Sequence, residues 1–142
     1  MICYMALKMI FLDSSFLIAI EVENDENHEK ARDIVLKIIS GDFGEIVISD
    51  YVFDETLTVT LLKTKDLKKA ILVGENLKVS SKIIRVEEDV FDMSWNIFKE
   101  QKNNKLSFTD CTNIAIMRIN KIKNIATFDK DFKGIEGINV VS

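Results

Sequence analysis

Short apolar runs alternate with longer stretches of helical periodicity, and this alternation constrains the fold more than any other feature of the sequence. The apolar runs lie at 9–12, 46–48, 83–86, 124–128 and 138–141. Helical spacing of apolar residues is found over 15–22, 28–40, 50–63, 66–79, 87–103 and 107–121. Strands that alternate with helices form parallel sheets covered on both faces. The sequence therefore predicts an α/β protein, a three-layer α/β/α sandwich with a five-stranded, mainly parallel sheet.

The length and composition fit one soluble domain. The 142 residues are 47% hydrophobic and 30% charged, and no apolar run approaches the roughly 20 residues that span a membrane. We expect one domain over 1–142, in which 1–8 can be an extension without the marks of a signal peptide. Cys3 and Cys111 lack the spacing of a metal site or a disulfide framework, which favours a reducing, cytoplasmic setting.

Two acids follow predicted strands directly. Asp13 ends the run at 9–12 and precedes Ser14 and Ser15, which can cap a helix. Asp129 ends the run at 124–128 in the same way, and Asp131 could take its place. Open α/β sheets place their sites at the carboxyl ends of strands, so these acids are candidate functional residues. The alternative for Asp129 and Asp131 is a solvated turn.

Two more candidate acids are expected inside helices. Val52, Val59 and Leu62 form an apolar stripe at helical spacing, and Glu55 falls on it. A buried, unpaired carboxylate costs several kcal/mol, roughly, so Glu55 should pair with Lys or Arg or bind a metal. Asp110 has capping-box spacing from the serine three residues before it, where a helix N-terminus stabilises an acid. A structural role would suffice for either acid alone.

Together the four acids indicate a metal site at the carboxyl edge of the sheet. Carboxylates gathered in one pocket repel one another unless a cation lies among them. Oxygen-rich sites suit Mg²⁺ or Mn²⁺, and with phosphate oxygens as further ligands the natural chemistry is phosphodiester hydrolysis. The net charge of −4 argues against binding polyanions by charge alone, but allows nucleic acid bound through a cation.

Four sequence segments occur in an order that resembles the PIN-domain ribonucleases, most closely the VapC-type toxins of toxin–antitoxin pairs. They are Phe11-Leu12-Asp13-Ser14-Ser15-Phe16-Leu17-Ile18, Asp54-Glu55-Thr56-Leu57-Thr58, Ser107-Phe108-Thr109-Asp110-Cys111 and Ala126-Thr127-Phe128-Asp129-Lys130-Asp131-Phe132. The resemblance spans nearly the whole chain. It implies a PIN-like fold and a divalent-metal-dependent endoribonuclease acting on RNA.

The resemblance also implies roles for individual residues. The catalytic and metal-binding residues would be Asp13, Glu55, Asp110 and Asp129, holding one or two Mg²⁺ or Mn²⁺ ions. Supporting positions would be Ser14, Thr109 and Asp131. A small antitoxin and a homodimeric partner subunit are implied as well.

Two other functions compete with this interpretation. A signalling receiver domain needs adjacent acids after its first strand and a lysine after its last. Ser14 follows Asp13 here and 138–142 contains no lysine, so we reject it. An RNA-binding or RNA-processing protein of the same fold, outside a toxin–antitoxin pair and with weak or lost catalysis, stays open. Cys111 and His28 are expected to pack rather than react. A phosphate-binding rim or a solvated basic face could be formed by Lys63, Lys65, Lys68 and Lys69.

Overall fold

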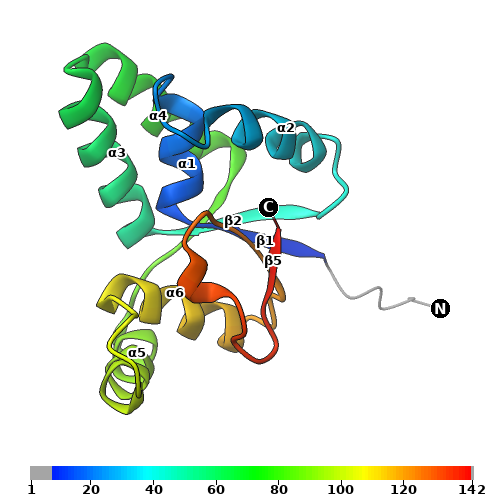
Figure 1. The fold of residues 1–142 in the computed structure, drawn as a ribbon, viewed down its shortest axis with the longest axis vertical. Coiled ribbons are helices and arrows are strands. Elements are labelled where there is room, and N and C mark those ends of the chain that lie inside the picture. The colour runs from blue at the N-terminus through cyan, green and yellow to red at the C-terminus, as the bar shows by residue number, and fades with distance from the viewer. Residues whose placement is uncertain (1–7, 142) are drawn as a thin grey trace.

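The computed structural model describes residues 8–141 and has a central sheet between two helical layers (Figure 1). The strands are β1 (Met9–Leu12), β2 (Glu45–Ser49), β3 (Lys82–Ile84), β4 (Asn124–Ala126) and β5 (Asn139–Val141). They lie in the order β3-β2-β1-β4-β5, and every neighbouring pair is parallel. The predicted α/β/α sandwich is confirmed. The proposed extension lies, apart from Lys8, outside the described residues, as does Cys3.

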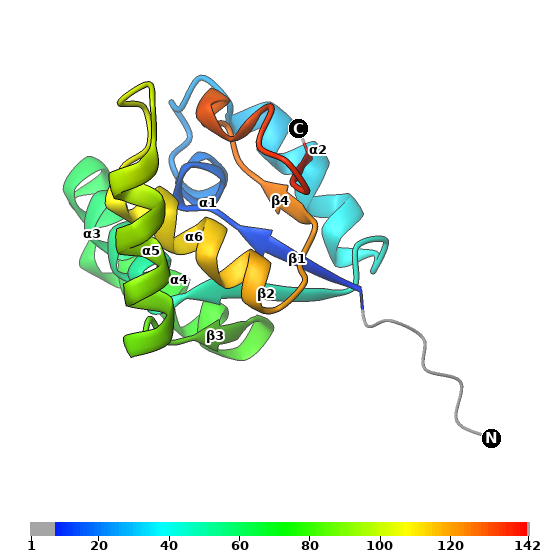
Figure 2. The ribbon, with the colours of Figure 1, turned by 90° about the horizontal axis from the view of Figure 1, so that it is seen from below.

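The helices divide between the two faces of the sheet. The structure has α1 (Ser14–Glu21), α2 (His28–Ile39), α3 (Asp50–Thr64), α4 (Leu67–Ser80), α5 (Glu88–Glu100) and α6 (Phe108–Ile119). Right-handed crossovers from β1 out to β3 put α1 to α4 on one face, and the return to β4 puts α5 and α6 on the other (Figures 1 and 2). Within residues 8–141, every helix is too short or too polar to cross a membrane.

The centre of the sheet is fully buried because helices cover it on both sides. Ile10 and Phe11 of β1 and Ile125 of β4 have no exposed surface. Such strands are continuously apolar rather than alternating, which is why their runs stand out in the sequence. Because β1 and β4 pair in parallel, the polar residues that follow them lie next to one another at the carboxyl edge of the sheet.

Helix α3 buries a different face from the one predicted. Its buried residues are Val52, Thr56 and Thr60, spaced four apart, whereas Glu55 is exposed and Leu62 is 68% exposed. The prediction that Glu55 lies on a buried apolar stripe is therefore wrong. Counting the two threonines as polar hid the inward face, although their methyl groups pack in a core.

The apolar residues of α5 cover more than one stripe of the helix and predict that it is well buried, but the structure leaves much of it exposed. Only Val90 and Ser94 are buried, while Phe91 and Trp95 are about half exposed. The aromatic rings instead pack on one another, with centroids 5.3 Å apart for Phe91 and Phe108. The prediction of a well-buried helix is wrong because α5 is an outer helix that packs mainly on α6.

The end of α5 is set by the loop that follows it. Gln101 Nε2 donates to the Leu106 carbonyl at 3.0 Å, and Leu106 N donates to Gln101 Oε1 at 2.8 Å. This side chain closes the loop, so the helix ends at Glu100 rather than running to residue 103 as expected. The loop delivers the chain to the start of α6.

Candidate active site

The carboxyl ends of β1 and β4 form the centre of the candidate site. The chain leaves β1 towards β2 and leaves β4 towards β5, so the crossovers diverge between these two strands. Sites in open α/β sheets lie at such a divergence. Asp13, at the end of β1, is only 4% exposed, and its backbone N–H donates to the Ala126 carbonyl of β4 at 3.0 Å.

The buried Asp13 carboxylate is held by side chains from three segments. Its Oδ2 accepts hydrogen bonds from Thr127 Oγ1 at 2.7 Å and from Ser15 Oγ at 3.0 Å. Its Oδ1 accepts one from Asn113 Nδ2 of α6 at 3.1 Å. Buried polar groups need such partners. The three bonds satisfy the carboxylate and fix its orientation.

The two hydroxyl groups are themselves oriented by the backbone. Phe128 N donates to Ser15 Oγ at 3.1 Å, and Asp129 N donates to Thr127 Oγ1 at 3.0 Å. Because each oxygen already accepts a backbone proton, its own proton can be donated to Asp13. This network links the end of β1 to the end of β4 and so sets Asp13 relative to Asp129.

Sequence reasoning missed three of these residues as parts of the site. Ser15 and Thr127 were given no role in the site, although both lie in segments that resemble the family, and Asn113 was not considered at all. A signal existed for the first two, because each lies two residues from a candidate acid. Nothing local marks Asn113, which is 100 residues from Asp13 in sequence.

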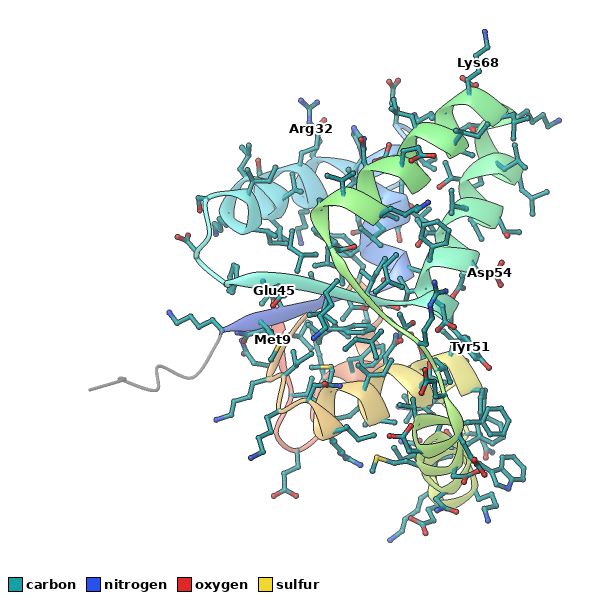
Figure 3. All side chains as sticks on the ribbon, turned by 180° about the vertical axis from the view of Figure 1, so that it is seen from behind. Met9, Arg32, Glu45, Tyr51, Asp54 and Lys68 are labelled. Carbon is teal, nitrogen blue, oxygen red and sulfur yellow. The ribbon has the colours of Figure 1, made fainter. Side chains whose placement is uncertain are left out.

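All four predicted acids line one open pocket of about 480 Å³. The pocket lining consists of Asp13, Ser14, Ser15, Ile18, Glu55, Val59, Lys105, Ser107, Asp110 and Asp129. Glu55 reaches it from the exposed side of α3 and not from a buried stripe. Figure 3 shows Tyr51 and Asp54 at the start of α3, beside α6, and both line the pocket next to this one together with Glu55 and Thr109.

Asp110 combines a structural and an electrostatic feature. The predicted capping box is present, since Ser107 N donates to Asp110 Oδ2 at 2.9 Å and Asp110 N donates to Ser107 Oγ at 3.0 Å. Burial raises the pKa of Asp110 to about 6, with further contributions from the charges of Asp13 and Asp129. Its carboxylate is therefore destabilised by its surroundings when no cation is near.

Asp129, rather than Asp131, lines the pocket. Asp131 N donates to Asp129 Oδ1 at 2.9 Å, so Asp131 helps to position its neighbour through its backbone. Burial raises the pKa of Asp129 above its ordinary value, and the charges of Asp131 and Asp13 add to the rise. The two acids thus form the expected turn, but one of them also belongs to the pocket.

The donor set fits a hard divalent cation. All four pocket acids offer carboxylate oxygens, and a cation would offset the burial and the neighbouring negative charges that raise the pKa values of Asp110 and Asp129. In the conformation described for 8–141, however, no three His, Cys, Asp or Glu side chains converge closely enough to hold an ion. Asp110 and Asp129 each turn one oxygen to a backbone N–H, and Glu55 is exposed. Metal binding would therefore require side-chain rotation.

Cys111 and His28 are structural, as expected. Cys111 is fully buried, and burial raises the pKa of its thiol to about 11, so it stays protonated at neutral pH. His28 Nδ1 lies 2.7 Å from the Ala19 carbonyl, which links α2 to α1. Neither residue lines the acidic pocket.

Comparison with known proteins shows which family the chain matches. The family model described as PIN domain matches residues 10–138. Ribonuclease VapC6 of Methanocaldococcus jannaschii is 26% identical over an alignment of 151 positions, which covers 93% of this chain and 95% of the relative.

Solved structures agree with the sequence comparison. VapC20 of Mycobacterium tuberculosis, described as a toxin that cleaves the sarcin–ricin loop, matches with a TM-score of 0.77 and 25% identity, covering 89% of this chain and 95% of that one. A toxin–antitoxin complex from Klebsiella pneumoniae matches with a TM-score of 0.66 and 20% identity over 94% and 96% of the two chains, and so shares the fold.

Proposed function

This chain belongs to the PIN-domain family, and on that premise we propose that it is an endoribonuclease that hydrolyses RNA phosphodiester bonds with the help of Mg²⁺ or Mn²⁺. The observation that carries the proposal is one pocket lined by four carboxylates from separate segments of the chain. Acids that each had only a structural role would not need to line the same pocket. The ribonuclease activity is that of the similar VapC6, and the choice of metal rests on the oxygen donors.

We assign the metal to Asp13, Glu55, Asp110 and Asp129. The ion would activate a water for attack on phosphorus and stabilise the charge that develops on the phosphate. Asp13 is the best-ordered ligand in this assignment, because three side-chain donors hold its carboxylate. A bound cation would lower the raised pKa of Asp110 and so favour its charged, ligating form.

Supporting roles are proposed for three residues. Ser14 lines the pocket beside Asp13 and can contact bound substrate. Thr109 lines the neighbouring pocket, where RNA next to the cleaved bond would lie. Asp131 positions Asp129 through its backbone N–H.

We extend the proposal to a cytoplasmic toxin that is held inactive by a small antitoxin. Among the similar structures, VapC20 is a toxin and the Klebsiella pneumoniae structure is a toxin–antitoxin complex. A homodimer is also proposed, because exposed leucine and isoleucine side chains on α3 and α4 leave an apolar surface without cover. These side chains are Leu61, Leu62, Leu67, Ile71 and Leu72.

The test of the enzyme proposal is cleavage of defined RNAs by purified protein. With Mg²⁺ or Mn²⁺ it should cut a panel of structured RNAs that includes a sarcin–ricin loop, and a chelator should stop the reaction. Asp13→Asn should lower the rate by roughly 10³-fold or more, because it removes a ligand that the metal requires. Asp33→Asn, an exposed acid on α2, is the matched control and should keep full activity.

Equal cleavage by the Asp13→Asn protein would identify a contaminating nuclease and overturn the assignment. RNA binding without any cleavage would favour the alternative of an RNA-binding protein of the same fold. The toxin role has its own test. Induction of the gene should arrest growth, and co-expression of a short reading frame directly upstream should restore it.

A further inference from the structure

A second, smaller pocket of about 140 Å³ adjoins the acidic pocket and shares Asp129 with it. Its lining consists of Asn27, Lys30, Thr127, Phe128, Asp129, Lys130 and Lys133. We call it the lysine pocket. Asp129 is the one carboxylate among these lining residues, against three ammonium groups. The lining residues of the lysine pocket therefore carry a net positive charge directly beside the acidic pocket.

The lysines reach this pocket from separate parts of the chain. Lys30 belongs to the first turn of α2, Lys130 opens the short 3-10 helix η1 (Lys130–Phe132), and Lys133 follows it. The fold thus brings together cations about 100 residues apart at the exit of β4. Lys105 lines the acidic pocket itself. Lysines therefore contribute to the lining of both pockets.

An RNA strand needs such cations beside a carboxylate cluster. Each nucleotide carries a negative phosphate, and four carboxylates with a single divalent ion still leave a net negative charge, which repels the phosphates that flank the cleaved bond. Lysine side chains next to the acids offset that repulsion and place the strand. The small volume and the three lysines in the lining suit a phosphate group.

We propose that the lysine pocket binds a backbone phosphate of the RNA adjacent to the one held at the acidic pocket. The inference rests on the proposed ribonuclease function and names the residues that position its substrate, Lys30, Lys130 and Lys133, with Asn27 beside them. These residues differ from the rim suggested from sequence. Lys68 lies at the outer end of the α3–α4 hairpin, away from Asp54 (Figure 3), and Lys65 is roughly 15 Å along the helix from Glu55.

The test compares two matched triple variants in an Asp110→Asn background, so that RNA is bound without being cut. One carries Lys30→Gln, Lys130→Gln and Lys133→Gln. The control carries Lys63→Gln, Lys65→Gln and Lys68→Gln. The Kd for a labelled RNA is measured by fluorescence anisotropy between about 50 and 300 mM salt, a range over which phosphate contacts weaken strongly. Thermal melting verifies that both variants are folded.

The lysine-pocket variant should bind about 10-fold more weakly at roughly 0.1 M salt. The slope of log K against log salt should fall by about 0.7, because the loss of one single-strand phosphate contact removes about that much. The loss of affinity should be equal for an RNA that the wild-type protein cleaves and for an RNA of scrambled sequence, since phosphates carry no sequence information. In proteins with Asp110 restored, KM should rise with little change in kcat. The control variant should match the parent protein.

An unchanged Kd and salt slope in the lysine-pocket variant would overturn this inference and leave the ribonuclease function standing. A loss of affinity as large in the control variant would also overturn it, because the effect would then come from net charge alone. If the wild-type protein neither binds nor cuts RNA, the proposed function fails and this subsite fails with it. If the lysine variant loses only antitoxin binding, the pocket recognises an acidic protein segment instead.

Discussion

Asp13 and Asp110 lie in one pocket but are stabilised differently. Asp13 accepts hydrogen bonds from three side chains, whereas Asp110 accepts from one backbone N–H of its capping box and faces two other acids. Hydrogen bonds to a carboxylate favour its charge, and burial near like charges opposes it. A bound cation should therefore lower the pKa of Asp110.

Asp110→Asn should stabilise the metal-free protein at neutral pH. Because the pKa is raised to about 6, the stability from the protonated carboxyl is complete below the ordinary value of 3.8 and is lost as the pH rises through about 6. The asparagine carries no charge and can still accept from Ser107 N. We expect a gain of about 1–2 kcal/mol at pH 7.5 after allowance for partial solvation, or a Tm rise of roughly 3–6 °C, vanishing towards pH 4.

Thermal melting from pH 4 to 8 in chelator measures this difference. Mn²⁺ should raise the Tm of the wild-type protein at pH 7.5 and have less effect on the variant, because only the wild type keeps the charged ligand. A variant that is less stable than wild type at pH 7.5 would show that the capping role of Asp110 outweighs its electrostatic cost.

Thr127→Val should lower activity by misplacing Asp13. The substitution keeps the shape of the side chain but removes the proton donated to Asp13 Oδ2 and the oxygen that accepts from Asp129 N. A hydrogen bond to a charged group contributes about 1.5–3 kcal/mol, so we expect kcat to fall by roughly 10- to 100-fold. Thr127→Ser restores the hydroxyl and should recover most of the activity. Equal kcat values for the valine and serine variants would contradict a positioning role.

At the scale of the element, α3 pairs an inward face of mixed character with an outward face that carries Glu55. The hydroxyl groups of Thr56 and Thr60 are buried without a hydrogen-bond partner among the described residues. Each such group loses its hydration on folding without replacement. The two unpartnered hydroxyl groups therefore lower the stability of the protein, and a side chain of the same shape without a hydroxyl would not.

Thr56→Val and Thr60→Val should each stabilise the protein. Valine has nearly the same shape and helix propensity as threonine, and it removes the unpartnered hydroxyl. We expect each substitution to raise the free energy of unfolding by about 1 kcal/mol, measured by urea unfolding. Thr58→Val on the exposed side of α3 is the control and should change stability by less than about 0.5 kcal/mol. A loss of stability in both core variants would indicate that buried water satisfies the hydroxyls.

At the scale of the whole molecule, apolar surface on α3, α4 and α5 is left without cover in one copy of the chain. Leu62, Leu72 and Trp95 are each about half exposed or more. The acidic and lysine pockets lie at the carboxyl edge of the sheet, where strands and helices far apart in sequence converge.

The protein should therefore behave as a dimer in solution. Light scattering should give about twice the 16.2 kDa of one chain, because a stable interface covers such apolar side chains. Leu62→Glu with Leu72→Glu should shift the mass to that of one chain without unfolding it. If the wild-type protein has the mass of one chain at a protein concentration of roughly tens of micromolar, the homodimer is contradicted. An unaffected dimer in the double variant would direct attention to the aromatic side chains of α5.

The sequence by itself determined the features that are encoded over a few residues. Apolar runs and helical spacing predicted the parallel α/β/α sandwich, the acids at the strand ends placed Asp13 and Asp129 at one edge, and the capping-box spacing of Ser107 and Asp110 is present. Such signals act through the chain's own neighbours, so they are readable without the fold.

Only the tertiary structure decided which side of each helix is covered and which distant residues meet. It exposed Glu55 and the rings of α5, brought Asn113 to Asp13 across 100 residues, and gathered lysines from α2 and η1 beside Asp129. These outcomes depend on how the crossovers pack against one another, because periodicity defines the faces of a helix and leaves open which neighbour covers them. The same packing sets Asp13 among its donors.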